Sequence, residues 1–417
     1  MTIAPDISNR IGLGLLRQPR TVLFGPGQRF QLPHLVAALG STVLVCTDER
    51  MTTTNDFVEL RDLLVAGGCT VHVFSRVQPD LPRTDVLELV AEFGNAGIEV
   101  VVGLGGGSCL DMAKVAGLVL SHGGDVSDYY GENLVTGPGL PVITVPTTGG
   151  TGAEVTCISV IFDADRGMKL GIASEYLEPH AAIVDPELTL SCPPGLTAAT
   201  GADALAHLVE AFTDRAKNPS TTDIAEHLYV GKNVLTDVFC RTGLQLLGTS
   251  LDRVVADPSD LSARSDTMMA SFCAGMAINT AGTAAAHAIQ SPIGNLTHTP
   301  HGIGVGALLP YVMRFNLPAN VPAFAEMAEL FGVATPGAIE LENARSAILR
   351  IEEILATLGV PLNLKDLGLL HEDIDFVASQ AMLATRLTAN NPRELTKEAV
   401  VAILERAHAD DRTWWEV

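Results

Sequence analysis

The chain has 417 residues, 47% of them hydrophobic, so it can bury the core of two ordinary domains and is not a disordered protein. Its 26 Lys and Arg residues against 48 Asp and Glu residues give a formal net charge of −22. Charge of this sign repels nucleic acid and anionic membranes, so we expect neither as a partner. A helix N-terminus can still bind a small anion in such a chain, because its field acts locally.

The sequence shows no targeting or membrane-spanning segment. The first ten residues, MTIAPDISNR, lack a charged region followed by an apolar core, and no apolar run reaches the roughly 20 residues of a membrane helix. The seven cysteines are scattered, odd in number and without a CxxC pair. They predict buried, reduced thiols in a cytoplasmic protein.

Short β-branched runs alternate with helical stretches over the first 190 residues. Strands are predicted at Thr21–Phe24, Thr42–Cys46, Val71–Phe74, Val100–Gly103, Val142–Val145 and 181–186. Helices are predicted near 55–66, 84–96 and 109–120. This alternation indicates a parallel sheet with helices on both faces.

The texture changes near residue 190, where we place a domain boundary. Alanine and leucine dominate beyond it, and the spacing of apolar residues becomes helical. We predict an all-helical second half with breaks at Pro219, Pro258, a loop over 291–302, Pro318, Pro336, Pro361 and Pro392.

A glycine-rich turn joins a predicted strand to a predicted helix in VVGLGGGSCLDMAK, residues 101–114. Glycines let a phosphate approach the backbone closely, and the free amides of a first helical turn bind a diphosphate. Ser108 is the expected N-cap of this helix. The string is neither G-x-G-x-x-G nor Walker A, so a tight turn without a ligand is the alternative.

Two further features favour a nucleotide. A loop of small residues, PTTGGTGAE at 146–154, ends another strand, and ligands of open α/β sheets collect at the carboxyl ends of strands. Asp48 ends the strand that begins at Thr42. A carboxylate there accepts hydrogen bonds from the adenosine ribose and repels a 2′-phosphate, which favours NAD over NADP. A turn-forming aspartate without a ligand is the alternative.

Four residues in the second half can hold one divalent metal ion: Asp203, His207, His287 and His301. The first two are four residues apart and share one face of a predicted helix. A glycine and a proline separate the last two, so we expect a helix ending near 290, a loop, and a new helix after Pro300. Imidazole and carboxylate ligands suit Fe(II) or Zn(II).

Four strings resemble the iron-containing (group III) alcohol dehydrogenase family: GGGSCLDMAK (105–114), PTTGGTGAE (146–154), GADALAH (201–207) and PHG (300–302). NPR at 391–393 resembles a further family string, and the resemblance runs from about residue 20 to about 410. It implies an α/β dinucleotide-binding domain, residues 1–190, and an all-helical metal-binding domain, residues 191–417, in the fold shared with dehydroquinate synthase. The active site then lies in the cleft between them.

The resemblance also implies roles for single residues. The family's metal ligands, through which catalysis proceeds, fall on Asp203, His207, His287 and His301. Its cofactor pattern falls on Asp48, Gly105, Gly106, Gly107, Ser108, Asp111, Thr147, Thr148 and Thr151. Lys169 resembles the family lysine that reaches the cofactor ribose.

The sequence departs from the family pattern in two places. Many members carry a histidine four residues after the third metal ligand, and this chain has Ser291 there. Ser291, His298 or a water can take over the proton relay that this histidine performs in the family, and the sequence does not choose among them. The stretch 217–242 is longer than usual and is expected to shape the substrate mouth or a subunit contact.

The expected activity is that of an NAD- and metal-dependent alcohol dehydrogenase or aldehyde reductase, assembled as a homodimer or larger homo-oligomer. Two rivals share the architecture: a lyase like dehydroquinate synthase, and a reductase of acidic oxo-substrates like maleylacetate reductase or hydroxyacid–oxoacid transhydrogenase. Both expect basic residues near the metal. The segments 195–212 and 284–305 contain no Lys or Arg, which favours a small neutral alcohol or aldehyde. A third rival binds metal and nucleotide without turnover.

Overall fold

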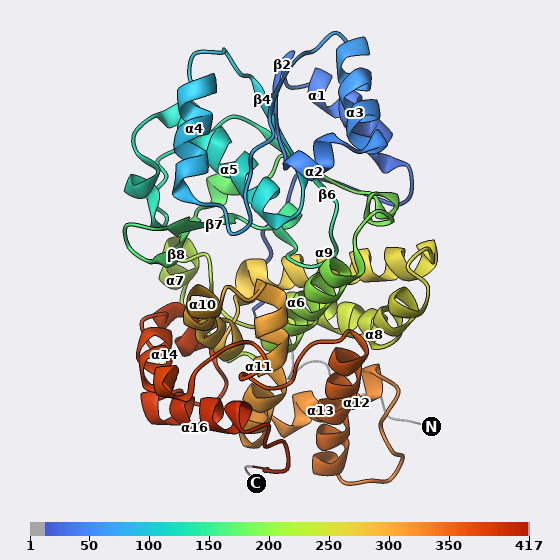
Figure 1. Ribbon diagram of the computed structural model, residues 1–417, viewed down its shortest axis with the longest axis vertical. Helices are drawn as coiled ribbons and strands as arrows, with labels where there is room; N and C mark the ends of the chain where they lie inside the picture. The colour runs from blue at the N-terminus through green and yellow to red at the C-terminus, as the bar shows by residue number, and fades with distance from the viewer. Residues whose placement is uncertain (1–12, 416–417) are drawn as a thin grey trace.

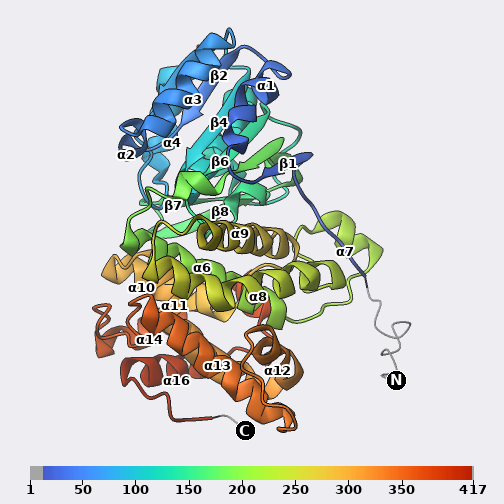
Figure 2. The ribbon, with the colours of Figure 1, turned by 90° about the vertical axis from the view of Figure 1, so that its right-hand side faces the viewer.

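The structure is a computed structural model that describes residues 13–415. The N-terminal decapeptide that argued against a leader lies outside these residues. An α/β part built on a parallel sheet lies at one end of the long axis, and a mostly helical part lies at the other (Figures 1 and 2). This two-part architecture is the one that the sequence predicts.

The main sheet has six strands in the order β1-β9-β6-β4-β2-β3, and every pair is parallel. The strands are β1 (Thr21–Phe24), β9 (Ala181–Val184), β6 (Val142–Pro146), β4 (Val100–Gly105), β2 (Thr42–Cys46) and β3 (Thr70–Phe74). β4, β6 and β9 are buried along their whole length, as strands covered on both faces must be. All six predicted strands are therefore confirmed.

Helices cover both faces of this sheet because successive strand residues point to opposite sides. In β2, Val43 and Val45 pack on one side against α1 (Leu32–Ala37) and α3 (Asn55–Ala66). Leu44 and Cys46 pack on the other side against α4 (Arg83–Phe93) and α5 (Gly107–His122). The short α2 (Glu49–Thr52) follows β2 directly, so the carboxyl edge of the sheet carries the turns that face the helical part.

A second, three-stranded sheet was not predicted. It comprises β5 (Gly131–Glu132), β8 (Met168–Ala173) and β7 (Ile158–Asp163) in that order. β7 and β8 form an antiparallel hairpin whose turn is fixed by Asp163, which accepts hydrogen bonds from the amides of Asp165 and Arg166. The hairpin lies between the main sheet and the helices (Figure 2).

The second half of the chain is helical, as predicted, and one large apolar core joins its helices. The helices are α6 (Pro194–Thr213), α7 (Thr221–Glu226), α8 (Val234–Ala256), α9 (Leu261–Ala281), α10 (Ala285–Thr297), α11 (His301–Asn316), α12 (Val321–Leu330), α13 (Glu340–Thr357), α14 (Ile374–Ala381), α15 (Thr385–Asn390) and α16 (Lys397–His408). Short 3-10 turns lie at Gln28–Gln31, Val126–Tyr129, Ala153–Val155, Glu175–Leu177, Pro186–Thr189, Leu317–Ala319 and His371–Asp373. α6 is the centre of this part, because it packs against α8, α9 and α11 and is buried over most of its length.

The predicted loop over 291–302 is wrong. α10 continues through Pro292 to Thr297, and only residues 298–300 separate it from α11. A proline inside a helix removes one backbone hydrogen bond. Pro292 and Ile293 are both buried, so packing against the helical core keeps the helix continuous across that lost bond. The other predicted proline breaks do fall between helices.

All seven cysteines lie in the described part of the chain as free thiols, and six of them are buried. The prediction of buried thiols is therefore confirmed for every cysteine except Cys69, which is half-buried. Among the described helices, none has the length and apolar character that crossing a bilayer requires.

Candidate functional site

A cavity of about 720 Å³ lies between the carboxyl edge of the main sheet and the helical part. Its walls come from the turns after β2, β4 and β6, from the β7–β8 hairpin, and from α6, α9, α10, α11 and α15. Ligand sites of open α/β sheets lie at this edge. Segments far apart in sequence, from Asp48 to Leu387, therefore meet around one space.

The glycine turn forms one end of the cavity. Gly105 ends β4 with a φ of 151°, and a Cβ there would lie 2.6 Å from Cys109 Sγ. A Cβ on Gly107 would lie 2.7 Å from Thr151 Cγ2. Only glycine fits these two positions, so the turn can bring its backbone amides to the cavity wall.

Ser108 is not the N-cap of α5, and that prediction is wrong. The cap is Gly106, whose extended backbone begins the helix two residues earlier than predicted, and no side chain caps the first turn. Ser108 is instead the second residue of the helix and lines the cavity. The uncapped amides at the start of α5 remain available to an anion such as a diphosphate.

The remaining predicted cofactor residues gather at the same end, with two exceptions. Asp48, Gly106, Gly107, Ser108, Asp111, Thr148, Thr151 and Lys169 line the cavity. Gly105 and Thr147 lie behind this wall, where the Thr147 amide donates to the Gly105 carbonyl at 2.9 Å and joins the ends of β6 and β4. These two residues support the wall.

Three charged residues of this group already have partners. One oxygen of Asp48 accepts the Met51 amide at 2.7 Å and caps α2, while the residue still lines the cavity. Asp111 accepts from Lys114 Nζ at 3.3 Å and from the Val160 amide at 3.0 Å, which ties α5 to β7. Lys169 Nζ lies 2.6 Å from Asp80 Oδ1.

The four predicted metal ligands gather on the helical side of the cavity. Asp203 Oδ1 lies 3.9 Å from His207 Nε2, 3.7 Å from His287 Nε2 and 3.6 Å from His301 Nε2. The ligand atoms of Asp203, His287 and His301 all lie within 4.8 Å of one another. The His207 ring stacks on that of His287 with centroids 4.6 Å apart.

This cluster fits a divalent cation. Two donors bound about 2.1 Å from one ion lie roughly 3–4 Å apart, as these atoms do. Asp203 Oδ1 and His287 Nε2 are both buried without a hydrogen-bond partner among the described residues. Buried polar atoms are rarely left unpaired, so a ligand in their midst accounts for both. One carboxylate and three imidazoles suit Fe(II) or Zn(II).

Glu210 orients one of the ligands and was not predicted. Its Oε2 lies 2.6 Å from His287 Nδ1, and the carboxylate also accepts from the amides of Ala284 and Ala286. A carboxylate on Nδ1 leaves Nε2 of the same ring facing the cluster. The available signal is its position, seven residues after Asp203 in an otherwise apolar stretch of α6.

Electrostatics divide the histidines. Burial lowers the pKa of His287, but Glu210 and Asp203 outweigh burial and raise it to about 9. Burial lowers the pKa of His301 to about 4, and it also lowers the pKa of His207. Burial opposes ionisation of Asp203, but the surrounding imidazoles hold its pKa below the usual range. The cluster therefore carries at least one carboxylate charge at neutral pH.

Of the two side chains considered for the proton relay, Ser291 lines the cavity and His298 does not. Ser291 lines the cavity one helical turn after His287. His298 caps the end of α10 in a left-handed conformation with a φ of 55° and is not among the lining residues.

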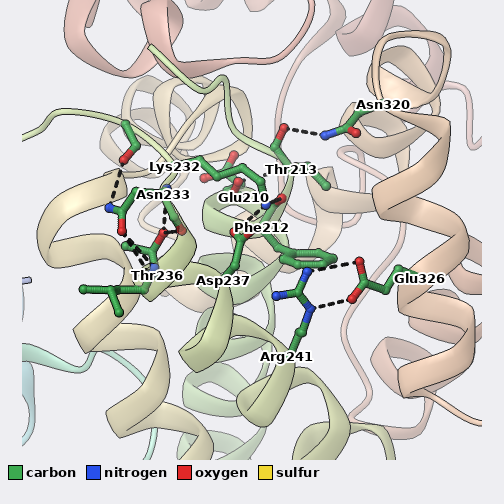
Figure 3. A network of polar contacts seen from close by, with 12 residues as sticks. Glu210, Phe212, Thr213, Lys232, Asn233, Thr236, Asp237, Arg241, Asn320 and Glu326 are labelled. Atoms are coloured by element: carbon green, nitrogen blue, oxygen red, sulfur yellow. Dashed lines mark hydrogen bonds and ion pairs between the residues drawn. The ribbon is translucent and has the colours of Figure 1, made fainter. Parts of the chain in front are cut away.

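The stretch 217–242 contributes Tyr229 to the cavity wall. Lys232 anchors the start of the following helix, because its ammonium donates to the Phe212 carbonyl at 2.6 Å and pairs with Asp237 (Figure 3). Arg241, one turn further along α8, pairs with Glu326 of α12 (Figure 3). These contacts therefore tie the stretch to α6 and α12.

Sequence reasoning also missed a cation in the wall. The segments around the metal ligands carry no Lys or Arg, but α15 brings Arg386 to the cavity lining from about 100 residues away. Only the packing of α15 on α10 places it there, and no local pattern announces it.

Family models, relatives of known activity and solved structures all resemble this chain over most of its length. Residues 19–186 match the family described as iron-containing alcohol dehydrogenase, and residues 197–408 match the C-terminal Fe-containing alcohol dehydrogenase family. The chain is 35% identical over 364 residues to an NAD-dependent methanol dehydrogenase of Bacillus methanolicus, covering 87% of this chain and 91% of that protein. It is 34% identical over 397 residues to a 1,3-propanediol dehydrogenase of Klebsiella pneumoniae, covering 93% and 97%.

Among solved structures, a 1,3-propanediol oxidoreductase matches with a TM-score of 0.89 and 32% identity, over 95% of this chain and 100% of that chain. Sequence and fold agree with these relatives over almost the whole length. The chain belongs to the iron-containing alcohol dehydrogenase family and is an oxidoreductase that acts on CH–OH groups.

Proposed function

We propose that the cavity is the active site of an NAD-dependent, metal-dependent alcohol dehydrogenase or aldehyde reductase. The metal ligands are Asp203, His207, His287 and His301. The observation that carries the proposal is the pair of buried, unpartnered atoms, Asp203 Oδ1 and His287 Nε2, on the helical side of the cavity. When bound there, Fe(II) or Zn(II) supplies a Lewis acid for the substrate oxygen.

The cofactor end is proposed to hold NAD, which supplies the redox partner of the alcohol or aldehyde. The amides at the start of α5 would hold the diphosphate, and Thr148, Thr151 and Lys169 line the same part of the cavity. One oxygen of Asp48 caps α2, and the other accepts a long contact from the Cys109 thiol at 3.9 Å. The carboxylate would also accept hydrogen bonds from the adenosine ribose, where its charge would disfavour the 2′-phosphate of NADP. The relatives that act with NAD support this choice.

The protein's own residues position the reactants. Glu210 fixes the ring of His287 so that Nε2 faces Asp203, and the stack of His207 on His287 holds both rings in place. Placing two reactants in one cavity removes much of the entropic cost of their encounter. No side chain is assigned as an obligatory general base. Ser291 stands where many family members have a proton-relaying histidine, so no residue of this chain is assigned that role.

Aldehyde reduction by the reconstituted protein tests the proposal. The metal-free protein loaded with Fe(II) or Zn(II) is expected to oxidise NADH when a panel of short aldehydes and ketones is supplied. His287→Ala should lose metal binding and keep NAD binding, because the two ends of the cavity are built by different segments. An inert panel, or loss of both ligands in the variant, would refute it.

We further propose a division into residues 1–190 and 191–417, a cytoplasmic location and a homo-oligomer. The last strand of the main sheet ends at Val184 and the first long helix begins at Pro194, which supports the division. Seven free thiols suit a reducing compartment. Exposed apolar side chains near the C-terminus, Leu370, Phe376 and Leu383, support a subunit contact, and light scattering of the purified protein tests it.

A further inference from the structure

One wall of the cavity carries a cation that forms no ion pair with a described carboxylate. Arg386 lines the cavity, and its guanidinium carbon lies 4.1 Å from the centroid of the Tyr229 ring. Within residues 13–415 this stacking is its only direct partner, and it forms no hydrogen bond or ion pair. We call Tyr229, Gly282, Thr283, Arg386 and Leu387 the Arg386 wall.

The Arg386 wall adjoins the segment that carries a metal ligand. One guanidinium nitrogen of Arg386 lies 3.5 Å from the point that a Cβ on Gly282 would occupy, and Gly282 is five residues before His287. Asn390 fixes this arrangement, because its side-chain amide donates to the carbonyls of Ala281 at 3.1 Å and Thr283 at 3.0 Å. The guanidinium therefore lies against the turn between α9 and α10, in the lining of the cavity.

A second unpaired donor belongs to the same wall. Tyr229 is 8% exposed, and its hydroxyl is buried without a hydrogen-bond partner among the described residues. A guanidinium and a phenol side by side offer several donors and one positive charge. An oxyanion is the ligand that satisfies both.

The surrounding charges do not cancel Arg386. Lys169, the lysine in the cavity lining, is paired with Asp80, and Arg50 lies two residues from Asp48 at the nucleotide end. Behind the wall, the carboxylate of Asp214 is buried without a hydrogen bond, and burial raises its pKa well above the ordinary value. Asp214 interacts with Arg386 electrostatically but forms no ion pair with it, so Arg386 is the one charged side chain of the Arg386 wall itself.

We propose that Arg386 and Tyr229 bind an anionic group of the substrate, so that the enzyme prefers a short aldehyde or alcohol with a carboxylate or sulfonate away from the reacting carbon. This inference rests on the proposed function of the cavity. It replaces the expectation of a neutral substrate, which considered only the segments 195–212 and 284–305. Those segments hold the metal ligands, and the cation arrives on another helix.

Kinetics with two aldehydes of equal carbon number test the proposal. The enzyme should reduce succinic semialdehyde with a kcat/KM about tenfold or more above that for butanal, since a charge-assisted contact is worth about 1.5–3 kcal/mol. Arg386→Gln should lower kcat/KM for succinic semialdehyde about 10- to 100-fold, mainly through KM, and change that for butanal by less than about twofold. Arg386→Lys should restore part of the loss, and Arg61→Gln, a surface arginine on α3 paired with Asp62, should change neither.

A binding measurement separates this inference from the proposed activity. Ethanesulfonate, which cannot be reduced, is titrated into the NADH-saturated enzyme by calorimetry at constant ionic strength. We expect binding by the native chain and its loss in Arg386→Gln. Equal preference for the two aldehydes, an equal loss for both in the variant, or a rise only in the KM for NADH would overturn the inference. If neither aldehyde reacts, the proposed function fails, and the titration alone decides whether the anion site exists.

Discussion

The Glu210 carboxylate orients the His287 ring so that its Nε2 atom faces Asp203. Glu210 contacts Nδ1 at 2.6 Å and is itself held by two backbone amides, so neither side chain is free to turn. Histidine ligands in metal sites commonly depend on such a contact for orientation and basicity. Glu210 is accordingly a positioning residue that acts through His287.

Replacing Glu210 should weaken metal binding without unfolding the helix. Glu210→Gln keeps the size of the side chain but removes its charge, and we expect affinity for Zn(II) to fall about 10- to 100-fold. Competition with a chromophoric chelator measures it. Glu326→Gln, which breaks a pair with Arg241 at the partly exposed end of the network in Figure 3, is the matched control. Unchanged affinity in Glu210→Gln would contradict the role.

Metal binding should release about one proton near neutral pH. His287 has a pKa of about 9 and is protonated, whereas burial keeps His301 neutral with a pKa of about 4. A metal binds only the neutral ring, so affinity should rise with pH up to about 9 and then level. Calorimetry in buffers of different ionisation enthalpy counts the proton. A binding heat independent of the buffer would contradict this assignment.

Asp48 should set the preference between the two dinucleotides. Asp48→Ser retains an oxygen to cap α2 but removes the charge that repels a 2′-phosphate. The native chain should have a higher kcat/KM with NADH than with NADPH, and the variant should lose most of that ratio. A native ratio below one would show that the carboxylate does not select the cofactor.

Sequence motifs point to residues that the structure brings together, whereas residues that packing alone places have no signal in the sequence. Asp203 and the histidines stand in short strings whose residue types already suit a metal. Glu210 has no such string, and its role depends on α10 lying against α6. Arg386 is placed by the contact of α15 with α10, which no local pattern encodes.

At the scale of elements, the β4–α5 turn works because two glycines leave room that a Cβ would fill. Gly105 combines a φ of 151° with a close approach to Cys109, and the start of α5 has no side-chain cap. Any other residue at position 105 would meet both an unfavourable backbone conformation and a clash with Cys109. The turn is therefore a joint requirement of folding and of anion binding.

Gly105→Ala should be costly on both counts. We expect the free energy of unfolding to fall by about 1–3 kcal/mol and the affinity for NADH to fall with it. Urea denaturation and fluorescence titration of NADH measure the two effects. Gly195→Ala, in the first turn of α6 where no atom lies within 4 Å of the new methyl group, should leave both unchanged or raise stability slightly. Equal behaviour of the two variants would contradict the argument.

The predicted elements succeeded where apolar periodicity is strong. The six parallel strands and α3 were located almost to the residue. The β7–β8 hairpin was missed, although it supplies Ile158, Lys169 and other residues to the cavity. The predicted end of α10 near residue 290 came too early. The helix continues through Pro292, because the buried packing of Pro292 and Ile293 outweighs the loss of one backbone hydrogen bond at the proline.

At the scale of the molecule, the two parts are joined by buried polar contacts beside the cavity. Asn279 of α9 accepts the Cys157 amide at 2.8 Å and donates to Glu178 at 3.2 Å and to the Arg17 carbonyl at 3.0 Å. Burial raises the pKa of Glu178 to about 7. It also raises the pKa of Glu154, at the end of the loop that follows β6, to about 7. Both carboxyl groups are therefore largely protonated in the folded protein at mildly acidic pH.

These two groups should make the protein less stable as the pH rises. Their ordinary value is 4.5, so between about pH 4.5 and about pH 7 the folded state holds protons that the unfolded state has lost. The contribution of Glu154 to the free energy of unfolding should fall by about 3 kcal/mol across that range and then level. Denaturant titrations at several pH values should show a flatter profile for Glu154→Gln, and an unchanged one for the exposed Glu372→Gln. A profile of the same slope in Glu154→Gln would contradict the assignment.

The central claim is that one divalent ion is held between α6, α10 and α11 beside a bound dinucleotide. Crystals of the metal-loaded protein with NAD, measured at the absorption edge of the metal, test it most directly. We predict a single anomalous peak about 2.0–2.3 Å from Asp203 Oδ1 and from Nε2 of His207, His287 and His301, with the diphosphate against the start of α5. An anomalous peak elsewhere would contradict this prediction. So would the absence of metal between these four side chains in crystals of enzyme that retains activity.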